Sequence, residues 1–353
     1  MRHPIRTIRF AAVATAVLPA ACGAAQPQFL PPRQVGVVQQ AAVNEASGLA
    51  AGRASPGVLW MHNDSGDSAR VFAMTPQGEP RGVYHLVGVL AVDWEDLAIG
   101  PGPEAGRWYL YIGDIGDNQG VRPEIRVHRV PEPVIDPAAP PVQADLVGVE
   151  SLVLHYPDGP RDAETLLVDP WTCDLYVVSK RANRSRVYRA PFPQSTTQPN
   201  VLEFRGELPW GWATGGDISP DGREIVIRGY LSAMGWRRPP GTTVWEALQG
   251  MGYSVPVPLE PQGEAICFDA VSGLNYYTVS EGSQPPIYLI ERILTPGDLD
   301  HDGDVDLDDL TALVDLLLGL DTDPARLAVA DLDGSGAVDG LDIAPFVARI
   351  LAT

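Results

Sequence analysis

Two acidic segments near the C-terminus, residues 298–309 and 331–342, have the spacing of a calcium-binding loop. In such a loop, oxygen ligands come from positions 1, 3, 5, 7, 9 and 12, position 7 uses its backbone carbonyl, and glycine at position 6 permits the turn. The first segment places Asp298, Asp300, Asp302, Asp304, Asp306 and Asp309 at these positions. The second places Asp331, Asp333, Ser335, Ala337, Asp339 and Asp342 there. We therefore predict one Ca²⁺ ion in each segment.

Each loop leads into an apolar segment that we expect to be a helix, from Leu310 and from Ile343. Two loop-then-helix units ending in Asp at position 12 resemble the type I dockerin family over residues 297–352. The resemblance implies a module that binds two Ca²⁺ ions and docks onto a cohesin-type protein domain through its helix faces. Loop positions 10 and 11 are Leu307-Asp308 and Gly340-Leu341, where the family commonly has small hydroxyl residues, so the identity of the cohesin stays open.

Acidic residues also begin five apolar runs in the body of the chain: Glu45, Glu95, Glu164, Asp217 and Glu264. After each run come a turn and further short runs rich in aromatic or β-branched residues. Such regularly spaced short strands predict the four-stranded blades of an all-β propeller. We predict five blades, with six as the alternative if the long stretch around residues 120–160 contains another.

The outer strands of these blades can also be placed. Third strands are expected at 70–73, 125–128, 186–189, 243–245 and 286–289. Fourth strands are expected near 83–86, 152–155, 201–204 and 255–258. The fifth unit has no outer strand after it, so we predict that the apolar residues 35–38 supply that strand and close the ring.

The pattern of an inner strand that begins with an acid and a second strand rich in aromatics resembles the calcium-associated propellers called phytase-like or strictosidine-synthase-like. The resemblance covers roughly residues 35–293. It implies the fold and an association with calcium, but one fold serves many functions.

If each of the five acids begins an innermost strand, all five converge at the mouth of one central channel. Carboxylates so close together repel one another unless a cation lies among them, and Ca²⁺ prefers oxygen ligands. We therefore expect a channel that is filled by a further calcium ion or by water. The alternative is that these acids accept hydrogen bonds from backbone N–H groups and bind nothing.

The loops after the second strands are expected at the same face. Asp64, Asp114 and Asp117 could bind Ca²⁺ or act in catalysis, although Asp is also an ordinary turn residue. Lys180 and Arg228 could hold a phosphate or carboxylate, or form salt bridges to neighbouring acids.

The composition and the N-terminus limit the class of protein. With 25 Lys and Arg against 45 Asp and Glu, the net charge is −20, which argues against a nucleic-acid partner. Residues 1–25 have the basic, apolar and small-residue regions of an export signal, and the apolar run is too short for a transmembrane span. We expect an extracellular or cell-envelope protein, with lipid attachment at Cys22 as an alternative to free secretion. The expected divisions are this signal, a propeller over 26–295 and the docking module over 296–353.

Two functional hypotheses remain open. In the first, the module docks to its partner while the propeller recognises a ligand, a carbohydrate or a phosphorylated small molecule, in a polysaccharide-degrading setting. In the second, the propeller is a hydrolase: a glycosidase with paired carboxylates, or a calcium-dependent phosphoesterase. The sequence does not decide between a binding protein and an enzyme.

Overall fold

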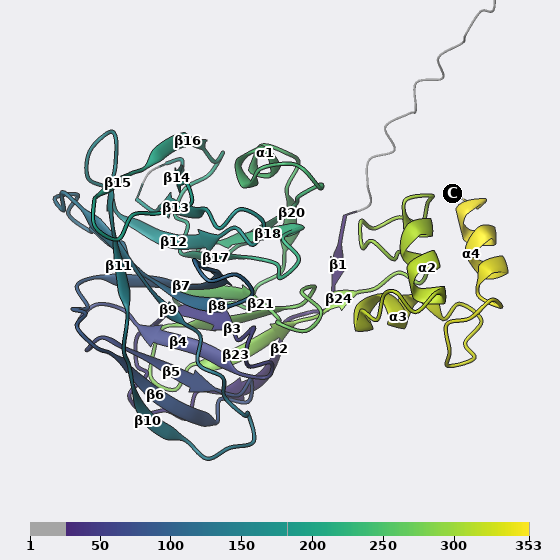
Figure 1. Cartoon of the computed structure of the whole chain (residues 1–353), viewed down its shortest axis with the longest axis horizontal. Coiled ribbons are helices and arrows are strands. Elements are labelled where there is room, and N and C mark those ends of the chain that lie inside the picture. Colours follow the sequence, from purple (N-terminus) through teal and green to yellow (C-terminus); the bar gives the residue numbers. More distant parts are fainter. Residues whose placement is uncertain (1–25, 182, 353) are drawn as a thin grey trace, which may run out of the picture.

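The computed structural model describes residues 26–181 and 183–352. The expected export signal, with Cys22, lies outside these residues. Five mainly antiparallel β-sheets form the larger part of the chain, and three helices near the C-terminus form a separate module beside them (Figure 1). No helix among the described residues has the length and hydropathy needed to cross a bilayer.

The first two blades each gain a fifth, parallel strand at the outer edge. From the inside outward, blade 1 contains β3 (Ala46–Ala51), β4 (Leu59–Asn63), β5 (Arg70–Met74), β6 (Pro80–Leu86) and β10 (Val142–Leu146). Blade 2 contains β7 (Trp94–Pro101), β8 (Trp108–Asp114), β9 (Ile125–Pro131), β11 (Glu150–His155) and β15 (Asn200–Val201). The long stretch around residues 120–160 therefore completes blade 2 and extends blade 1, and forms no sixth blade.

The other three blades have four strands each. Blade 3 contains β12 (Ala163–Val168), β13 (Leu175–Ser179), β14 (Arg186–Ala190) and β16 (Glu203–Glu207). Blade 4 contains β17 (Gly215–Ile218), β18 (Glu224–Arg228), β19 (Ala233–Arg237) and β20 (Tyr253–Val255). Blade 5 contains β21 (Gly263–Phe268), β22 (Tyr276–Ser280), β23 (Pro286–Ile290) and β2 (Arg33–Val37). The predicted five-bladed propeller is confirmed.

The ring is closed by its two ends. Strand β2 pairs antiparallel with β23, which confirms the predicted outer strand of the fifth blade. Next to it, β1 (Gln28–Phe29) pairs with β24 (Arg292–Ile293). The inner strands contact one another in the cyclic order β3, β7, β12, β17 and β21 and back to β3. The N-terminal end of each inner strand therefore opens on the same central axis.

One predicted strand is wrong. Residues 243–245 begin the short helix α1 (Val244–Leu248) rather than the third strand of blade 4, which is β19. Thr243 caps this helix through its side chain, and Glu246 returns the bond to the backbone of Thr243. This reciprocal capping stabilises the start of a helix, and its effect outweighs the strand preference of the β-branched residues Thr243 and Val244.

Apolar side chains fill the space between every pair of neighbouring blades. Five separate buried clusters do this, and each draws residues from two adjacent blades. Trp60 and Trp94 join blades 1 and 2, while Tyr253 and Phe268 join blades 4 and 5. Burying a side chain such as Phe268 contributes about 1.5–3 kcal/mol, so these clusters hold the inner strands in fixed positions.

Two buried aspartates link neighbouring inner strands below the mouth of the axis. Asp96 on β7 accepts from its neighbour Leu97 N and from Leu166 N on β12, both at 2.8 Å. Asp217 on β17 likewise accepts from Ile218 N at 2.8 Å and from Phe268 N on β21 at 3.0 Å. Each carboxylate thus satisfies an amide of the next blade.

The C-terminal module contains α2 (Asp309–Leu317), α3 (Pro324–Ala330) and α4 (Ile343–Ile350) around a small core with Leu313, Val329 and Phe346. The two helices predicted after the loops are confirmed as α2 and α4. Helix α3 was not predicted, although Asp323 caps it and Pro324 opens it, which is a recognisable helix start.

Replacing Asp96 with alanine should lower the free energy of unfolding by about 3 kcal/mol, because two buried amides lose their acceptor. Urea denaturation followed by tryptophan fluorescence measures this loss. Asp145→Ala, on the exposed face of β10, is the matched control and should change stability little. Equal effects of the two substitutions would contradict the role given to Asp96.

Candidate functional site

The two acidic loops of the C-terminal module share the glycine turn and each gathers three carboxylates, from positions 1, 3 and 5 in the first loop and 1, 3 and 12 in the second. Carboxylate oxygens of Asp298, Asp300 and Asp302 lie within 4.8 Å of one another in the first loop, as do those of Asp331, Asp333 and Asp342 in the second. The glycines at position 6, Gly303 and Gly336, have φ of +98° and +87°. Their N–H groups donate to Asp298 and Asp331, so position 1 folds back over the turn.

The aspartate at position 12 of each loop accepts hydrogen bonds from backbone amides earlier in the same loop. Asp309 accepts from the amides of Leu299, Asp300 and Asp306, and Asp342 accepts from the equivalent amides of the second loop. Burial, then the neighbouring aspartates, raises the pKa of Asp298 to about 7 and that of Asp300 to about 6. One buried oxygen of Asp298, at position 1, accepts no hydrogen bond in the described chain. This unsatisfied oxygen fits a hard divalent cation.

The helices after the loops carry matching exposed apolar residues. On α2 and just beyond it these are Leu310, Val314 and Leu318, with 43%, 42% and 66% of their surface exposed. On α4 and just beyond it, Ile343, Val347 and Leu351 occupy the equivalent positions and are 46%, 45% and 81% exposed. We call these two sets the apolar stripes. Neither stripe belongs to the core of the module, so both are available for a protein contact.

A polar pocket lies at the mouth of the propeller axis. Its lining comes from all five blades and consists of Ser47, Asp64, Glu95, Asn118, Glu164, Lys180, Arg181, Tyr230, Gln262, Glu264 and Glu281. Asp93 and Asp162 stand directly before the inner strands β7 and β12 and bring further carboxylates to it. We call this set the central pocket.

β-bulges determine which acids reach the central pocket. The register with the second strand shifts next to Ser47, Glu95, Glu164 and Glu264, and each of these residues is the extra one of its inner strand. A bulge redirects the side chain of its extra residue, and here all four point to the axis. Strand β17 pairs without a shift, and its Asp217 lies deeper in the channel.

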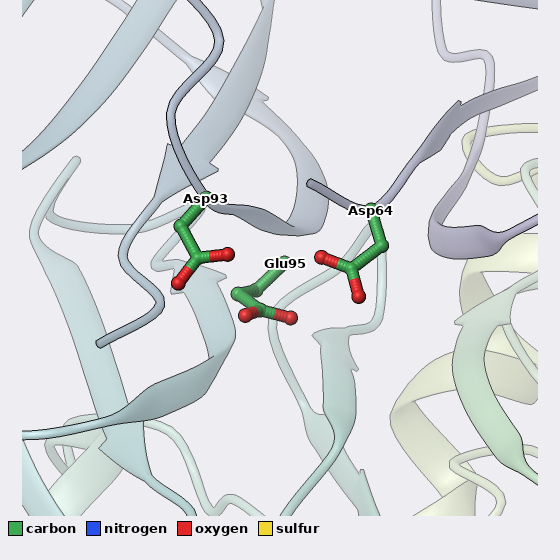
Figure 2. A group of neighbouring side chains, drawn as sticks. All are labelled: Asp64, Asp93 and Glu95. Atoms are coloured by element: carbon green, nitrogen blue, oxygen red, sulfur yellow. The ribbon is translucent and has the colours of Figure 1, made fainter. Parts of the chain in front are cut away.

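Three carboxylates from blades 1 and 2 form the most compact part of the central pocket. Asp64, Asp93 and Glu95 have oxygens within 4.8 Å of one another and point toward a common centre (Figure 2). A second such group, Glu95, Asp162 and Glu164, shares Glu95 with the first. Gly116 borders both Asp93 and Glu95, and a Cβ there would lie 2.2 Å from Glu95 Oε1. Any larger residue at 116 would displace the carboxylates of Glu95 and Asp93.

Burial and mutual repulsion disfavour the charged form of these acids. Burial, then Glu164, Asp64 and Asp93, raises the pKa of Glu95 well above its ordinary value. Burial raises the pKa of Glu164 to about 8, that of Glu264 to about 7 and that of Asp93 to about 6. One oxygen of Glu264 is buried and has no hydrogen-bond partner in the described chain. Shifts of this kind in a concave site mark a candidate functional site.

The positive charge of Lys180 balances part of the negative charge of the central pocket. Its ammonium forms an ion pair with Glu164 and lies 4.7 Å from the centre of the Tyr230 ring. Burial opposes its charge, yet Glu164 and Glu264 raise the pKa of Lys180 above the ordinary value. Among the described residues, no Lys or Arg forms an ion pair with Asp64, Asp93 or Glu95. The negative charge of this group is therefore not balanced by a basic side chain of the described chain.

The remaining residues singled out from the sequence lie outside the central pocket. Glu45 is exposed; its backbone carbonyl accepts from Asp64 N at 2.8 Å and its N–H donates to Asn63 Oδ1 at 3.2 Å. Asp217 lies 3.7 Å from Arg53 in the channel. Arg228 is fully buried and donates to Glu260 and to the carbonyl of Ala265.

Two more of those residues organise the loop beside the central pocket. Asp114 binds Arg122 at 2.7 Å and accepts from the amide of Asp93. Asp117 accepts from the amides of Val121 and Arg122 and donates its own N–H to Asp162. Asp114 and Asp117 therefore position Asp93 and Asp162 by hydrogen bonds, as turn residues do.

Sequence reasoning missed Asp93, Asp162 and Glu281. Asp93 and Asp162 stand two residues before Glu95 and Glu164, and that repeated spacing was the available signal. Glu281 directly follows β22, as Asp64 follows β4.

Residues 296–351 match the family model of the dockerin type I domain. The module that the loops predicted is thus a type I dockerin domain. Among solved structures, the chain is similar to one in a nidogen/laminin complex, at 12% identity and a TM-score of 0.41, over 76% of this chain and 98% of that one. It is also similar to a calcium-binding protein, regucalcin, from Agrobacterium tumefaciens, at 13% identity and a TM-score of 0.34, over 73% and 93% of the two chains. No curated protein sequence matches the chain.

In the absence of divalent cations, the free energy of unfolding should fall as the pH rises from about 5 to about 8. The pKa of Glu264 is about 7 in the fold against an ordinary value of 4.5, so the folded state keeps a proton that the unfolded state releases. The stability that protonated Glu264 contributes is fully present below about pH 4.5 and is lost as the pH rises through about 7. Urea denaturation in EDTA at several pH values measures the slope.

Glu264→Gln should flatten that slope, because the amide has no proton to lose. The raised pKa values of Asp298 and Asp300 also make stability fall with pH, equally in the unmodified protein and in the variant. The difference between the two slopes therefore reports on the central pocket. Identical slopes would contradict the raised pKa of Glu264.

Proposed function

We propose that this chain is an exported calcium-binding component of a protein assembly. Its dockerin domain docks to a cohesin-type domain, and its propeller binds an oxygen-rich ligand at the central pocket with the help of a cation. The match of residues 296–351 to the dockerin family carries the docking part of this proposal. The proposed setting, extracellular polysaccharide degradation, rests on the dockerin domain alone.

The docking surface that we propose consists of the two apolar stripes. They occupy equivalent positions in the two loop-then-helix units, and their exposed fractions are nearly equal at Leu310 and Ile343 and at Val314 and Val347. Calcium is required because the aspartates of each loop must be held together before α2 and α4 can take their places. Two ions per dockerin domain are proposed, one in each loop.

Docking should depend on both calcium and the apolar stripes. The double variant Val314→Asp, Val347→Asp should lose at least about 100-fold in affinity for the cohesin domain that binds the unmodified chain, since each change puts a charge into an apolar contact. Surface plasmon resonance against a panel of cohesin domains, in calcium and in EDTA, measures this.

Val142→Asp, at an exposed valine on β10 of the propeller, is the matched control and should bind normally. Unchanged affinity of the double variant, or full binding in EDTA, would refute the docking surface.

In the propeller we propose that Asp64, Asp93 and Glu95 hold one divalent cation, calcium by its preference for oxygen. The observation that supports it is a compact set of carboxylates without a basic partner, whose pKa values rise at Glu95 and Asp93. Lys180 lies on the other side of the same pocket. A ligand that gives oxygen atoms to the cation and to Lys180, such as a carbohydrate or a phosphorylated small molecule, fits this pairing.

Hydrolysis in the central pocket is the second candidate. Glu95 and Glu164 have oxygens within 4.8 Å of one another and raised pKa values, as a proton donor beside a second carboxylate requires. Turnover of aryl glycosides or 4-nitrophenyl phosphate that Glu164→Gln abolishes would favour an enzyme. Ligand binding without turnover would favour recognition.

The double variant Asp93→Asn, Glu95→Gln should bind one calcium ion fewer per chain than the unmodified protein, because an amide lacks the carboxylate charge. Equilibrium dialysis with metal analysis gives the count. Glu45→Gln, which neutralises an acid outside the central pocket, should keep the full count. An equal count in all three proteins would remove the propeller cation and leave the dockerin proposal intact.

A further inference from the structure

A buried arginine connects the propeller to the first calcium loop. Arg292 on β24 is 8% exposed, and its guanidinium forms an ion pair with Glu224 on β18 of blade 4. Its Nη2 donates to the backbone carbonyl of His301 at 2.6 Å. His301 is the fourth residue of the first loop, between Asp300 and Asp302. One side chain thus binds both parts of the chain.

The propeller side of this contact is rigid. Tyr253 Oη donates to Glu224 Oε2 at 2.7 Å and lies 3.2 Å from Tyr276 Oη. The Phe29 ring packs against Tyr276 with 5.4 Å between ring centres. Glu224 is therefore fixed before it binds Arg292, and it neutralises the charge that Arg292 would otherwise bring near a calcium site.

On the dockerin side of this contact, Arg292 binds the first loop at the residue where the backbone turns. His301 has φ of +59°, a left-handed conformation that is uncommon for a residue other than glycine. The equivalent residue of the second loop is Gly334, with φ of +74°. Arg292 donates to the carbonyl of this residue, which lies between Asp300 and Asp302 of the first loop.

The two loops differ in how far they are covered. Asp298 is buried and residues 300–304 are half-buried, whereas residues 333–337 of the second loop are exposed. Asp300 and His301 border a small cavity of about 30 Å³ together with Arg223 and Ser272 of the propeller. The propeller therefore covers the first loop, while the second loop lies in solvent.

We propose that Arg292 couples the first calcium loop to the propeller, so that calcium in this loop and attachment of the dockerin domain to blade 4 strengthen each other. Such coupling is reciprocal: if attachment raises calcium affinity by a given factor, calcium strengthens attachment by the same factor. The second loop is outside this coupling. The inference rests on the proposed binding of calcium by the dockerin domain.

The first experiment measures calcium affinity of the first loop in the full chain, by titration calorimetry. Asp331→Asn and Asp333→Asn remove the second loop's site, and Asp93→Asn and Glu95→Gln remove the proposed propeller site. In this background the charge-balanced pair Arg292→Gln, Glu224→Gln should weaken calcium binding about tenfold.

The matched control is Arg228→Gln, Glu260→Gln, which removes another buried propeller ion pair, of 3.2 Å, whose hydrogen-bond partners all lie in the propeller. It should leave the affinity unchanged. Equal or tighter calcium binding after the Arg292 change would overturn the coupling. Absence of calcium binding already in the background protein would overturn the calcium proposal itself.

A second measurement does not require any change at Arg292. Calcium should slow proteolysis of the connector at residues 294–297 in the chain whose second loop is disabled, and should give no protection when Asp300→Asn and Asp302→Asn disable the first loop. The coupling would also be overturned if calcium protected the connector only when the second loop is intact. It would likewise be overturned if calcium gave no protection in either protein.

Discussion

Negative charges held close together in partly buried places are the constraint on which both regions of the molecule depend. In the central pocket the fixed inner strands keep Asp64, Asp93 and Glu95 together, and in the first loop the backbone amides keep Asp298 beside Asp300. In both places the surrounding hydrogen bonds and packing oppose the movement that would relieve this repulsion. Each group must then hold protons or take a cation. Lys180 supplies a cation for part of the pocket, and the folded chain leaves the rest of the charge to be neutralised from solution.

The propeller could be predicted from sequence because the repeat of short strands is visible in it, down to the closing strand β2. The identity of the pocket acids was harder to predict, because a bulge moves a side chain by one residue without changing the apolar pattern. On blade 1 the axis-facing position belongs to Ser47 and not to Glu45. On blade 4 there is no bulge, and Asp217 takes the place that Asp96 has on blade 2.

The dockerin domain was the more predictable part because the groups of each loop lie within twelve consecutive residues, so spacing in sequence determines proximity in space. In the central pocket proximity arises from the closing of the ring, which brings Asp64 of blade 1 and Glu264 of blade 5 to one mouth. No spacing rule gives that distance. The contact of Arg292 with His301 could not be predicted for the same reason. The position of Arg292 depends on Glu224 and on the aromatic rings packed beside Glu224, which are distant in sequence.

The pairing of β2 with β23 has a consequence for how the chain folds. Strand β2 precedes every blade in the sequence, yet its partner lies near the end of the propeller, so this contact closes one of the longest loops in the fold. Until it forms, both strands keep open edges, which are templates for aggregation. Contacts so distant in sequence form slowly. For a chain that is synthesised from its N-terminus, β2 must stay unpaired until β23 has been made, so its edge is open to pairing with other chains during that interval.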